Sequence, residues 1–179
     1  MSSVRMGEMC IASGSNDELV AIGLGSCIGL ALIDRSAGVA GLAHVVLPES
    51  GGAAGPAGKF ADLAVPELLD QVQKAGARKD KLEAVLVGGA KMFALGAGMD
   101  IGSRNEAAVR EALSAHRLRV RATATGGNAG RTMRVLAGAG TVNVHEAGSK
   151  PETLFGDASV AARSGSIGAP RLRIAGAEA

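Results

Sequence analysis

The order in which strand-like and helix-like hydrophobic patterns follow one another is the feature that most limits how this chain can fold. Four short apolar runs bounded by turn residues occupy residues 4–47, and they predict β-strands. Apolar residues then recur at helical spacing between Val65 and Val72, and Gly76 predicts the end of that helix. Pro66 restricts where the helix begins, because proline is well tolerated only in the first turn.

A second succession of strand and helix follows. Residues 82–87 predict a buried strand, and Ser103 with Glu106 three residues later has the spacing of a capping box. Three further strands are predicted at residues 118–125, 131–136 and 141–145. Strands that surround two helices in this order predict an α/β fold, a layered sandwich with a mixed or antiparallel β-sheet and two main helices.

Composition excludes several classes of function. With three Phe, no Trp and no Tyr, the chain lacks the aromatic side chains on which nucleic-acid platforms stack bases. A net charge of +2 is too small for non-specific nucleic-acid binding, and the glycine-rich runs match no nucleotide fingerprint. Two cysteines without a CxxC or Cys/His cluster predict neither a disulfide framework nor a metal site. We therefore expect a protein without metal or organic cofactor.

The sequence also carries no signal for export or for membrane insertion. The N-terminus lacks the basic start, apolar run and cleavage site of a signal peptide. The most apolar stretch, residues 19–33, is shorter than a membrane-spanning helix and is interrupted by glycines. These features predict a cytoplasmic protein.

A predicted hairpin brings together the two residues that are the strongest catalytic candidates. If the chain turns around Ser36, Cys27 and His44 lie opposite or nearly opposite one another on adjacent antiparallel strands. Directly opposed residues have Cβ atoms about 4.5–5.5 Å apart and share a face of the sheet. A register change of one residue would place the two on opposite faces, so the prediction depends on the turn.

A cysteine beside a histidine suits nucleophilic catalysis. The imidazole can take the thiol proton, stabilise the thiolate as an ion pair and later protonate a leaving amine. The glycine-rich segment that ends in Gly25 and Ser26, directly before Cys27, offers backbone N–H groups for a developing oxyanion. The alternative is a structural pair, since cysteine in a strand usually packs as a small hydrophobe.

The chain resembles the chemoreceptor glutamine deamidase family, CheD. The resemblance is collinear over about residues 4–147, and its motifs follow one another at the expected spacing. They are Gly23–Cys27, Gly41–Pro48, Lys59–Asp62, Gly88–Phe93, Ile101–Asn105 and Thr125–Arg131.

The resemblance implies a protein-glutamine glutaminase, a hydrolase that converts glutamine side chains on the cytoplasmic helices of methyl-accepting chemotaxis receptors to glutamate. By motif position, Cys27 is the nucleophile and His44 the general base and acid. Gly126, Gly127 and Asn128 are candidates to line the glutamine pocket, although a plain hairpin turn explains them equally well. The family's fold is similar to that of cysteine-dependent deamidase toxins, which are layered α/β sandwiches.

One position departs from the family pattern. The family usually has a threonine six residues before the cysteine, where it orients the histidine, and this chain has Ala21. Orienting an imidazole through its Nδ1–H requires only an acceptor. We therefore expect the backbone carbonyl of Ala21 to take this role, and a weakened enzyme is the alternative.

Two other functions remain open. Proteins similar to this one also bind CheC-type phosphatases, so the chain could be a regulatory binding module with weak or no deamidase activity. It could also be another cysteine hydrolase that acts on a small amide. We expect the deamidase domain to span residues 1–148 and residues 149–179 to form a flexible tail, since their composition is rich in Ser, Gly, Ala and Pro.

Basic residues are concentrated in the second half of the chain. Only Glu106 and Glu111 oppose them within the first part of this stretch. A solvated surface is one explanation, and steering toward an acidic receptor bundle is the other. The residues are Arg104, Arg110, Arg117, Arg119, Arg121, Arg131 and Arg134.

Overall fold

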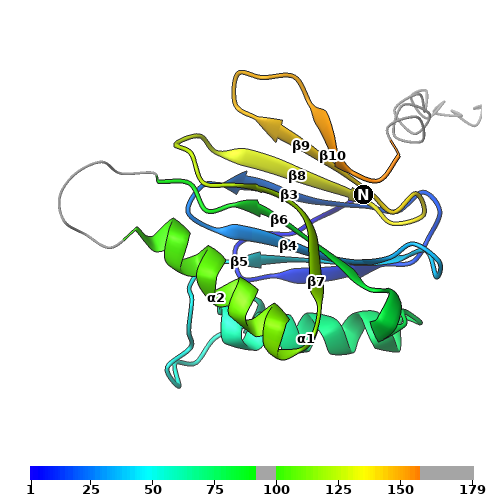
Figure 1. Cartoon of the computed structure of the whole chain (residues 1–179), viewed down its shortest axis with the longest axis horizontal. Coiled ribbons are helices and arrows are strands. Elements are labelled where there is room, and N and C mark those ends of the chain that lie inside the picture. The colour runs from blue at the N-terminus through cyan, green and yellow to red at the C-terminus, as the bar shows by residue number, and fades with distance from the viewer. Residues whose placement is uncertain (92–99, 158–179) are drawn as a thin grey trace, which may run out of the picture.

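The computed structural model describes residues 1–91 and 100–157, which form two five-stranded sheets and two α-helices (Figure 1). Sheet A has the strand order β1-β3-β8-β9-β10, and sheet B has the order β2-β5-β4-β6-β7. The strands are β1 (Ser2–Ser3), β2 (Met9–Ala12), β3 (Glu18–Leu24), β4 (Ile28–Asp34), β5 (Val39–Val45), β6 (Glu83–Gly88), β7 (Arg119–Thr125), β8 (Arg131–Leu136), β9 (Thr141–Glu146) and β10 (Glu152–Phe155). The helices are α1 (Ala61–Lys74) and α2 (Ile101–Ala115), and short 3-10 turns lie at Ala57–Lys59 and Lys79–Lys81.

The elements form three layers, as the predicted α/β sandwich requires. One hydrophobic cluster joins α1 and α2 to β4, β5 and β6, so the helices cover one face of sheet B (Figure 1). A second cluster joins β3, β8 and β9 to the opposite face of the same strands. The pairs β1–β3 and β6–β7 are parallel and the other pairs are antiparallel. The prediction of a mixed sheet with two helices is confirmed, and the strands divide between two sheets.

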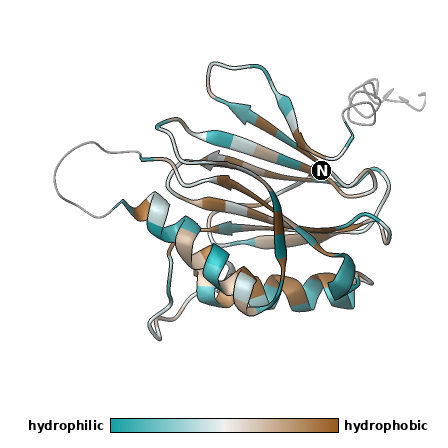
Figure 2. Ribbon diagram, viewed as in Figure 1, coloured by the Kyte–Doolittle hydropathy of each residue, from teal (hydrophilic) through white to brown (hydrophobic). Residues whose placement is uncertain are grey.

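Sheet B is buried on both faces at its centre. Every residue of β4 and β5 is buried, which explains why the sequence from Ile28 to Ile33 is almost continuously apolar. Figure 2 shows hydrophobic residues along these central strands and hydrophilic residues toward loops and helix turns. By contrast, β7 is an edge strand in which exposed arginines alternate with half-buried residues, as its alternating sequence predicts.

The helix starts differ from their predicted positions. The N-cap of α2 is Asp100, whose carboxylate accepts hydrogen bonds from the Ser103 N–H and hydroxyl at 3.3 and 2.6 Å. The predicted capping box at Ser103 is therefore wrong, because the aspartate three residues earlier caps the helix. Helix α1 begins at Ala61, so Pro66 lies inside it rather than in the first turn.

Both helices end in the same hydrogen-bonded turn with different residues at its key position. At the end of α1, Gly76 N–H donates to Gln73 O at 3.0 Å with Gly76 at φ +105°, so the predicted glycine stop is confirmed. At the end of α2, Arg117 N–H donates to Ser114 O at 2.9 Å, and Arg117 has φ +59°. Arg117 is the non-glycine residue with positive φ in the described chain.

The last described strand extends sheet A beyond the predicted domain boundary. Strand β10 pairs with β9, and Leu154 and Phe155 pack against the cluster between the sheets. The expectation that residues 149–179 form a flexible tail is therefore wrong for this segment. Four residues were too few to give a period in the sequence, whereas pairing and burial stabilise them in the fold. Residues 158–179 of the predicted tail lie outside the described chain.

Asp34 closes the hairpin between β4 and β5. Its buried carboxylate accepts hydrogen bonds from Ser36 N–H (2.9 Å), the Ser36 hydroxyl (2.5 Å) and Ala37 N–H (3.1 Å), and from Arg78 N–H (2.9 Å) after α1. Burial alone would raise the pKa of this carboxyl, but the hydrogen bonds from Arg78, Ser36 and Ala37 lower it below its ordinary value. The buried charge therefore fixes both the turn and its attachment to the helix layer.

Asp34→Asn should lower the free energy of unfolding at pH 7 by about 1–3 kcal/mol, because an amide NH₂ would face backbone N–H donors. Since the folded-state pKa of Asp34 lies below its unfolded value, the carboxylate's contribution is complete above about pH 4 and is lost as the pH falls through the folded pKa. Urea unfolding at pH 7 and at pH 3 should therefore show a gap between wild type and variant that narrows in acid. An equal gap at both pH values would contradict this role.

Candidate functional site

Cys27 and His44 lie on the same face of sheet B, at a diagonal rather than directly opposite. The turn contains residues 35–38, so Asp34 pairs with Val39 and His44 pairs with Gly29. The prediction that Cys27 and His44 lie opposite or nearly opposite holds only approximately, because Cys27 is two residues from Gly29, the partner of His44. This even offset leaves both side chains on one face. Cys27 packs into the cluster between the sheets, as do Ala40 and Leu42, which lie four and two residues before His44 on the same face of β5.

The N-terminal segment holds His44 in place. Val4 N–H donates to Val20 O in sheet A at 2.8 Å, and Gly7 N–H donates to His44 O in sheet B at 2.9 Å. Between these bonds the chain crosses from one sheet to the other, and Val4 O lies 3.3 Å from His44 Nδ1. Because a carbonyl oxygen only accepts, Nδ1 carries the hydrogen. The neutral imidazole therefore presents the lone pair of Nε2.

The carbonyl that contacts the imidazole belongs to Val4 and not, as predicted, to Ala21. Ala21 is a fully buried residue of β3, where it pairs with Met133 of β8. The segment that crosses between the sheets instead brings the Val4 carbonyl to the imidazole. A main-chain acceptor is thus present, but a different residue supplies it.

The reactive atoms of the pair are buried and not bonded to each other. His44 is 2% exposed, and among the described residues its Nε2 has no hydrogen-bond partner, Cys27 included. Burial raises the pKa of the Cys27 thiol. Burial also lowers the pKa of His44, against the opposing effects of the Val4 carbonyl and the Glu8 carboxylate. These two directions favour a neutral thiol and a neutral imidazole in the resting pair over the predicted ion pair.

Asn105 of α2 connects the backbone beside Cys27 to the backbone beside His44. Its side chain is fully buried, and Nδ2 donates to Ser26 O and to Val46 O, each at 2.9 Å. Sequence reasoning placed Asn105 in a family motif but gave it no role. Its contact with Ser26 could not be predicted from local sequence patterns, since 79 residues separate the two.

A close approach of two main chains fixes the segment that carries the nucleophile. Gly89 N–H donates to Cys27 O at 2.9 Å, and Ala90 N–H donates to Gly25 O at 2.7 Å. A Cβ atom on Gly88 would lie 2.1 Å from Cys27 O, so only glycine fits there. Gly25 N–H is occupied by a bond to Gly23 O at 2.9 Å, which removes it as a donor to an oxyanion. Ser26 and Cys27 remain as candidate backbone donors.

The predicted pocket residues are only partly brought to the site. Gly126 N–H donates to Gly88 O at 2.9 Å, and Lys91 N–H donates to Gly127 O at 2.8 Å, so the turn after β7 is tied to the strand end that contacts Cys27. Arg131 reinforces the turn, with Nη1 2.7 Å from Gly126 O. Asn128 is exposed, and no hydrogen bond within the described chain draws it toward Cys27.

Two structural features are absent from the described residues. No group of three His, Cys, Asp or Glu side chains is arranged to hold a metal ion. No helix in this part of the chain is both long and apolar enough to cross a membrane.

The fold is a two-sheet, two-helix α/β sandwich, and one face of its central sheet carries a buried cysteine and a buried histidine. Residues 46–146 match the family model described as CheD chemotactic sensory transduction. The chain belongs to the CheD family.

Relatives in bacteria and an archaeon support this membership over most of the chain. A Clostridium kluyveri protein is 43% identical over 142 residues, which cover 76% of this chain and 87% of that protein. A Symbiobacterium thermophilum protein is 40% identical over 154 residues (83% and 93%), and one from Methanococcus maripaludis is 43% identical over 145 residues (80% and 93%). Each bears the name "Probable chemoreceptor glutamine deamidase CheD".

The protonation states predict how Cys27 reacts with an alkylating agent. In a Cys10→Ala background, which removes the other cysteine, iodoacetamide labelling of Cys27 should rise with pH and show an apparent pKa above the ordinary value of about 8.5. Mass spectrometry of the labelled protein at a series of pH values gives the rate. A labelling plateau near neutral pH that disappears in His44→Ala would show that Cys27 and His44 form an ion pair at rest. That result would contradict the assignment of a neutral thiol and a neutral imidazole.

Removing the Asn105 side chain should destabilise the site and the fold together. Asn105→Ala leaves the carbonyls of the half-buried residues Ser26 and Val46 without this donor, so the free energy of unfolding should fall by about 1–3 kcal/mol. Asn128→Ala is the matched control for stability, because it removes the same side chain from an exposed position. Urea unfolding of the two variants should separate them clearly. Equal stabilities would show that the two bonds contribute nothing.

Proposed function

We propose that this protein hydrolyses glutamine side chains on the cytoplasmic helices of chemoreceptors to glutamate, and that it acts in the cytoplasm. The observation that carries the proposal is His44 Nε2, a buried acceptor that has no partner among the described residues and lies on the face that also holds Cys27. An unsatisfied buried polar atom costs about 1–3 kcal/mol, so a fold retains one where a function requires it. The names of the relatives point to the same activity.

The chemistry follows from the neutral resting pair. When a glutamine carboxamide enters, His44 Nε2 accepts the thiol proton as Cys27 Sγ bonds to the carboxamide carbon. The resulting oxyanion is stabilised by backbone N–H groups, with Ser26 and Cys27 as the candidates. The C–N bond then breaks, and the imidazolium gives its proton to the departing ammonia. Water deprotonated by His44 hydrolyses the thioester, releasing glutamate and the free thiol.

Main-chain bonds rather than a side-chain triad orient the base in this proposal. Val4 O fixes the Nδ1–H tautomer, as the third group of a triad does in other hydrolases. Ala21 then needs no side-chain acceptor, and the loss of the usual threonine does not by itself disable the site.

Exposed apolar side chains support a macromolecular substrate. Ile22 is 64% exposed and directly follows Ala21, and Met6 is 70% exposed in the turn between Val4 and Gly7. Met6 lies in the segment that carries Val4, and Ile22 lies in β3 of the sheet that packs against Cys27. Exposed apolar side chains on these two segments fit a protein surface better than a small polar amide.

A binding role through a CheC-type phosphatase is the second candidate. The raised pKa of the Cys27 thiol and the missing bond to His44 are what a non-catalytic pair would have. A chain with only this role would bind its partner without converting glutamine.

Incubation with a chemoreceptor cytoplasmic fragment tests the proposal. Peptide mass spectrometry should detect glutamine-to-glutamate conversion by wild type, none by Cys27→Ala, and conversion at least about 100-fold slower by His44→Gln, which removes the general base. Cys10→Ala is the matched control, because it removes the other free cysteine and should leave the rate unchanged.

Each alternative function has its own outcome in this assay. Conversion by Cys27→Ala at the wild-type rate would overturn the site assignment. Conversion of free glutamine but not of the receptor would indicate a small-amide hydrolase. A folded wild-type protein that converts neither substrate would favour the binding module.

A further inference from the structure

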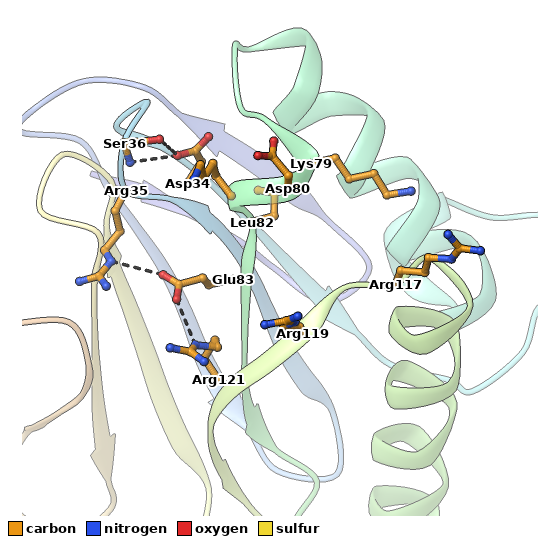
Figure 3. Close-up of a pocket in the computed structure, with 11 residues that line it drawn as sticks. Asp34, Arg35, Ser36, Lys79, Asp80, Leu82, Glu83, Arg117, Arg119 and Arg121 are labelled. Atoms are coloured by element: carbon orange, nitrogen blue, oxygen red, sulfur yellow. Dashed lines mark hydrogen bonds and ion pairs between the residues drawn. The ribbon is translucent and has the colours of Figure 1, made fainter.

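A large hollow lies at the end of sheet B opposite to Cys27. Its volume is about 650 Å³, and it is lined by residues 34–36 at the end of β4, residues 79–83 at the start of β6 and Arg117, Arg119 and Arg121 at the start of β7 (Figure 3). Cys27 directly precedes the opposite end of β4. At about 3.3 Å per residue, that strand places the hollow about 20 Å from the thiol. The hollow is therefore separate from the site described above.

The positive charge of this hollow is not neutralised within the described chain. Six of its eleven lining residues are Lys or Arg, and three are Asp or Glu. All three carboxylates already have partners. Asp34 accepts four hydrogen bonds, Asp80 pairs with Arg78 outside the hollow at 2.9 Å, and Glu83 pairs with both Arg35 (3.3 Å) and Arg121 (3.1 Å).

Four cations around the hollow remain without an ion pair to any described residue: Lys79, Lys81, Arg117 and Arg119. Figure 3 shows the Lys79 side chain extending toward Arg117, with Arg119 on the strand below them. Like charges that share one hollow repel each other, and an anion between them would remove the repulsion.

The rest of the arginine-rich stretch does not form a free basic surface. Arg110, Arg131 and Arg134 pair with Glu106, Glu146 and Glu18 at 2.7–2.9 Å. The predicted steering surface therefore reduces to the cations of this hollow.

The backbone of Arg117 adds an independent observation. It occupies the left-handed position at the end of α2, where the equivalent turn of α1 has Gly76. A side chain in this conformation is strained, and such strain persists where the side chain is useful. A cation near a helix C-terminus gains some energy from the helix dipole. That gain does not explain why three other unpaired cations line the same hollow.

The lining defines the class of anion. Arginine and lysine donors suit phosphate oxygens, and arginine binds them in a two-pronged geometry. Among the described residues that line the hollow, Leu82 is the apolar one and none is aromatic, so none of them can stack on a base. We propose that this hollow binds a small polyphosphate anion through its phosphates, with Lys79, Arg117 and Arg119 as the principal contacts.

Calorimetric titration of the full chain with inorganic tripolyphosphate tests the proposal, with sulfate at equal ionic strength as the reference anion. Tripolyphosphate should bind at least about tenfold more tightly than sulfate, and Arg119→Gln should weaken its binding about tenfold. Lys150→Gln, which removes an exposed lysine from the β9–β10 loop, should leave the affinity unchanged.

Arg117→Gly separates binding from folding. Glycine relieves the left-handed strain, so this variant should melt at the wild-type temperature or above while it binds tripolyphosphate about tenfold more weakly. Unchanged tripolyphosphate affinity in both Arg117→Gly and Arg119→Gln, or sulfate binding equal to that of tripolyphosphate, would overturn the proposal.

Two further ligands identify what the hollow recognises. ATP should bind within about threefold of tripolyphosphate, since the lining offers nothing for the base. Much tighter binding of ATP would contradict recognition through phosphates alone. A polyglutamate peptide that displaces tripolyphosphate at a lower concentration than ATP would assign the hollow to an acidic protein segment instead.

Discussion

The pairing of β4 with β5 is the constraint on which the rest of this molecule depends. It places Gly29 opposite His44, and it thereby puts the cysteine and the histidine on the face that packs against sheet A. A slip by one residue would turn His44 toward the helices and move every apolar side chain of β5 to the wrong layer. Because both faces of these strands are buried, the core itself opposes such a slip. The candidate site and the hydrophobic core are thus fixed by the same register.

Much of this arrangement could be predicted from the sequence, but the exact strand register and the first residue of a helix could not. Two apolar runs separated by four turn residues were sufficient to predict the hairpin and the shared face of Cys27 and His44. The register was missed by one or two positions, because the Asp34 carboxylate sets the extent of the turn and is itself held by Arg78 from a distant loop. The start of α2 was misplaced because the Ser103–Glu106 spacing matched a capping box, whereas the hydrogen bonds of the fold make Asp100 the cap.

The contacts that support the site could not be predicted, because they join distant parts of the chain. Asn105 reaches Ser26 across 79 residues, and Val4 reaches His44 across 40. Periodicity describes only neighbours along the chain, so it carries no information about such pairs. The resemblance to the family pointed to the correct motifs, yet it directed the search for a histidine partner to Ala21, where the family usually has a side chain. The fold supplies a main-chain oxygen from the segment that follows β1 instead.

Val4 contacts His44 through its backbone carbonyl and not through its side chain, and this has a consequence for mutagenesis. Every amino acid carries the same oxygen at that place, so exchanging the valine for another residue of tolerable size preserves the acceptor. A residue-by-residue substitution scan, or a survey of natural variation, would therefore pass over Val4. Shortening the first strand, or replacing the peptide bond after Val4 with an ester whose carbonyl is a weaker acceptor, would reveal it.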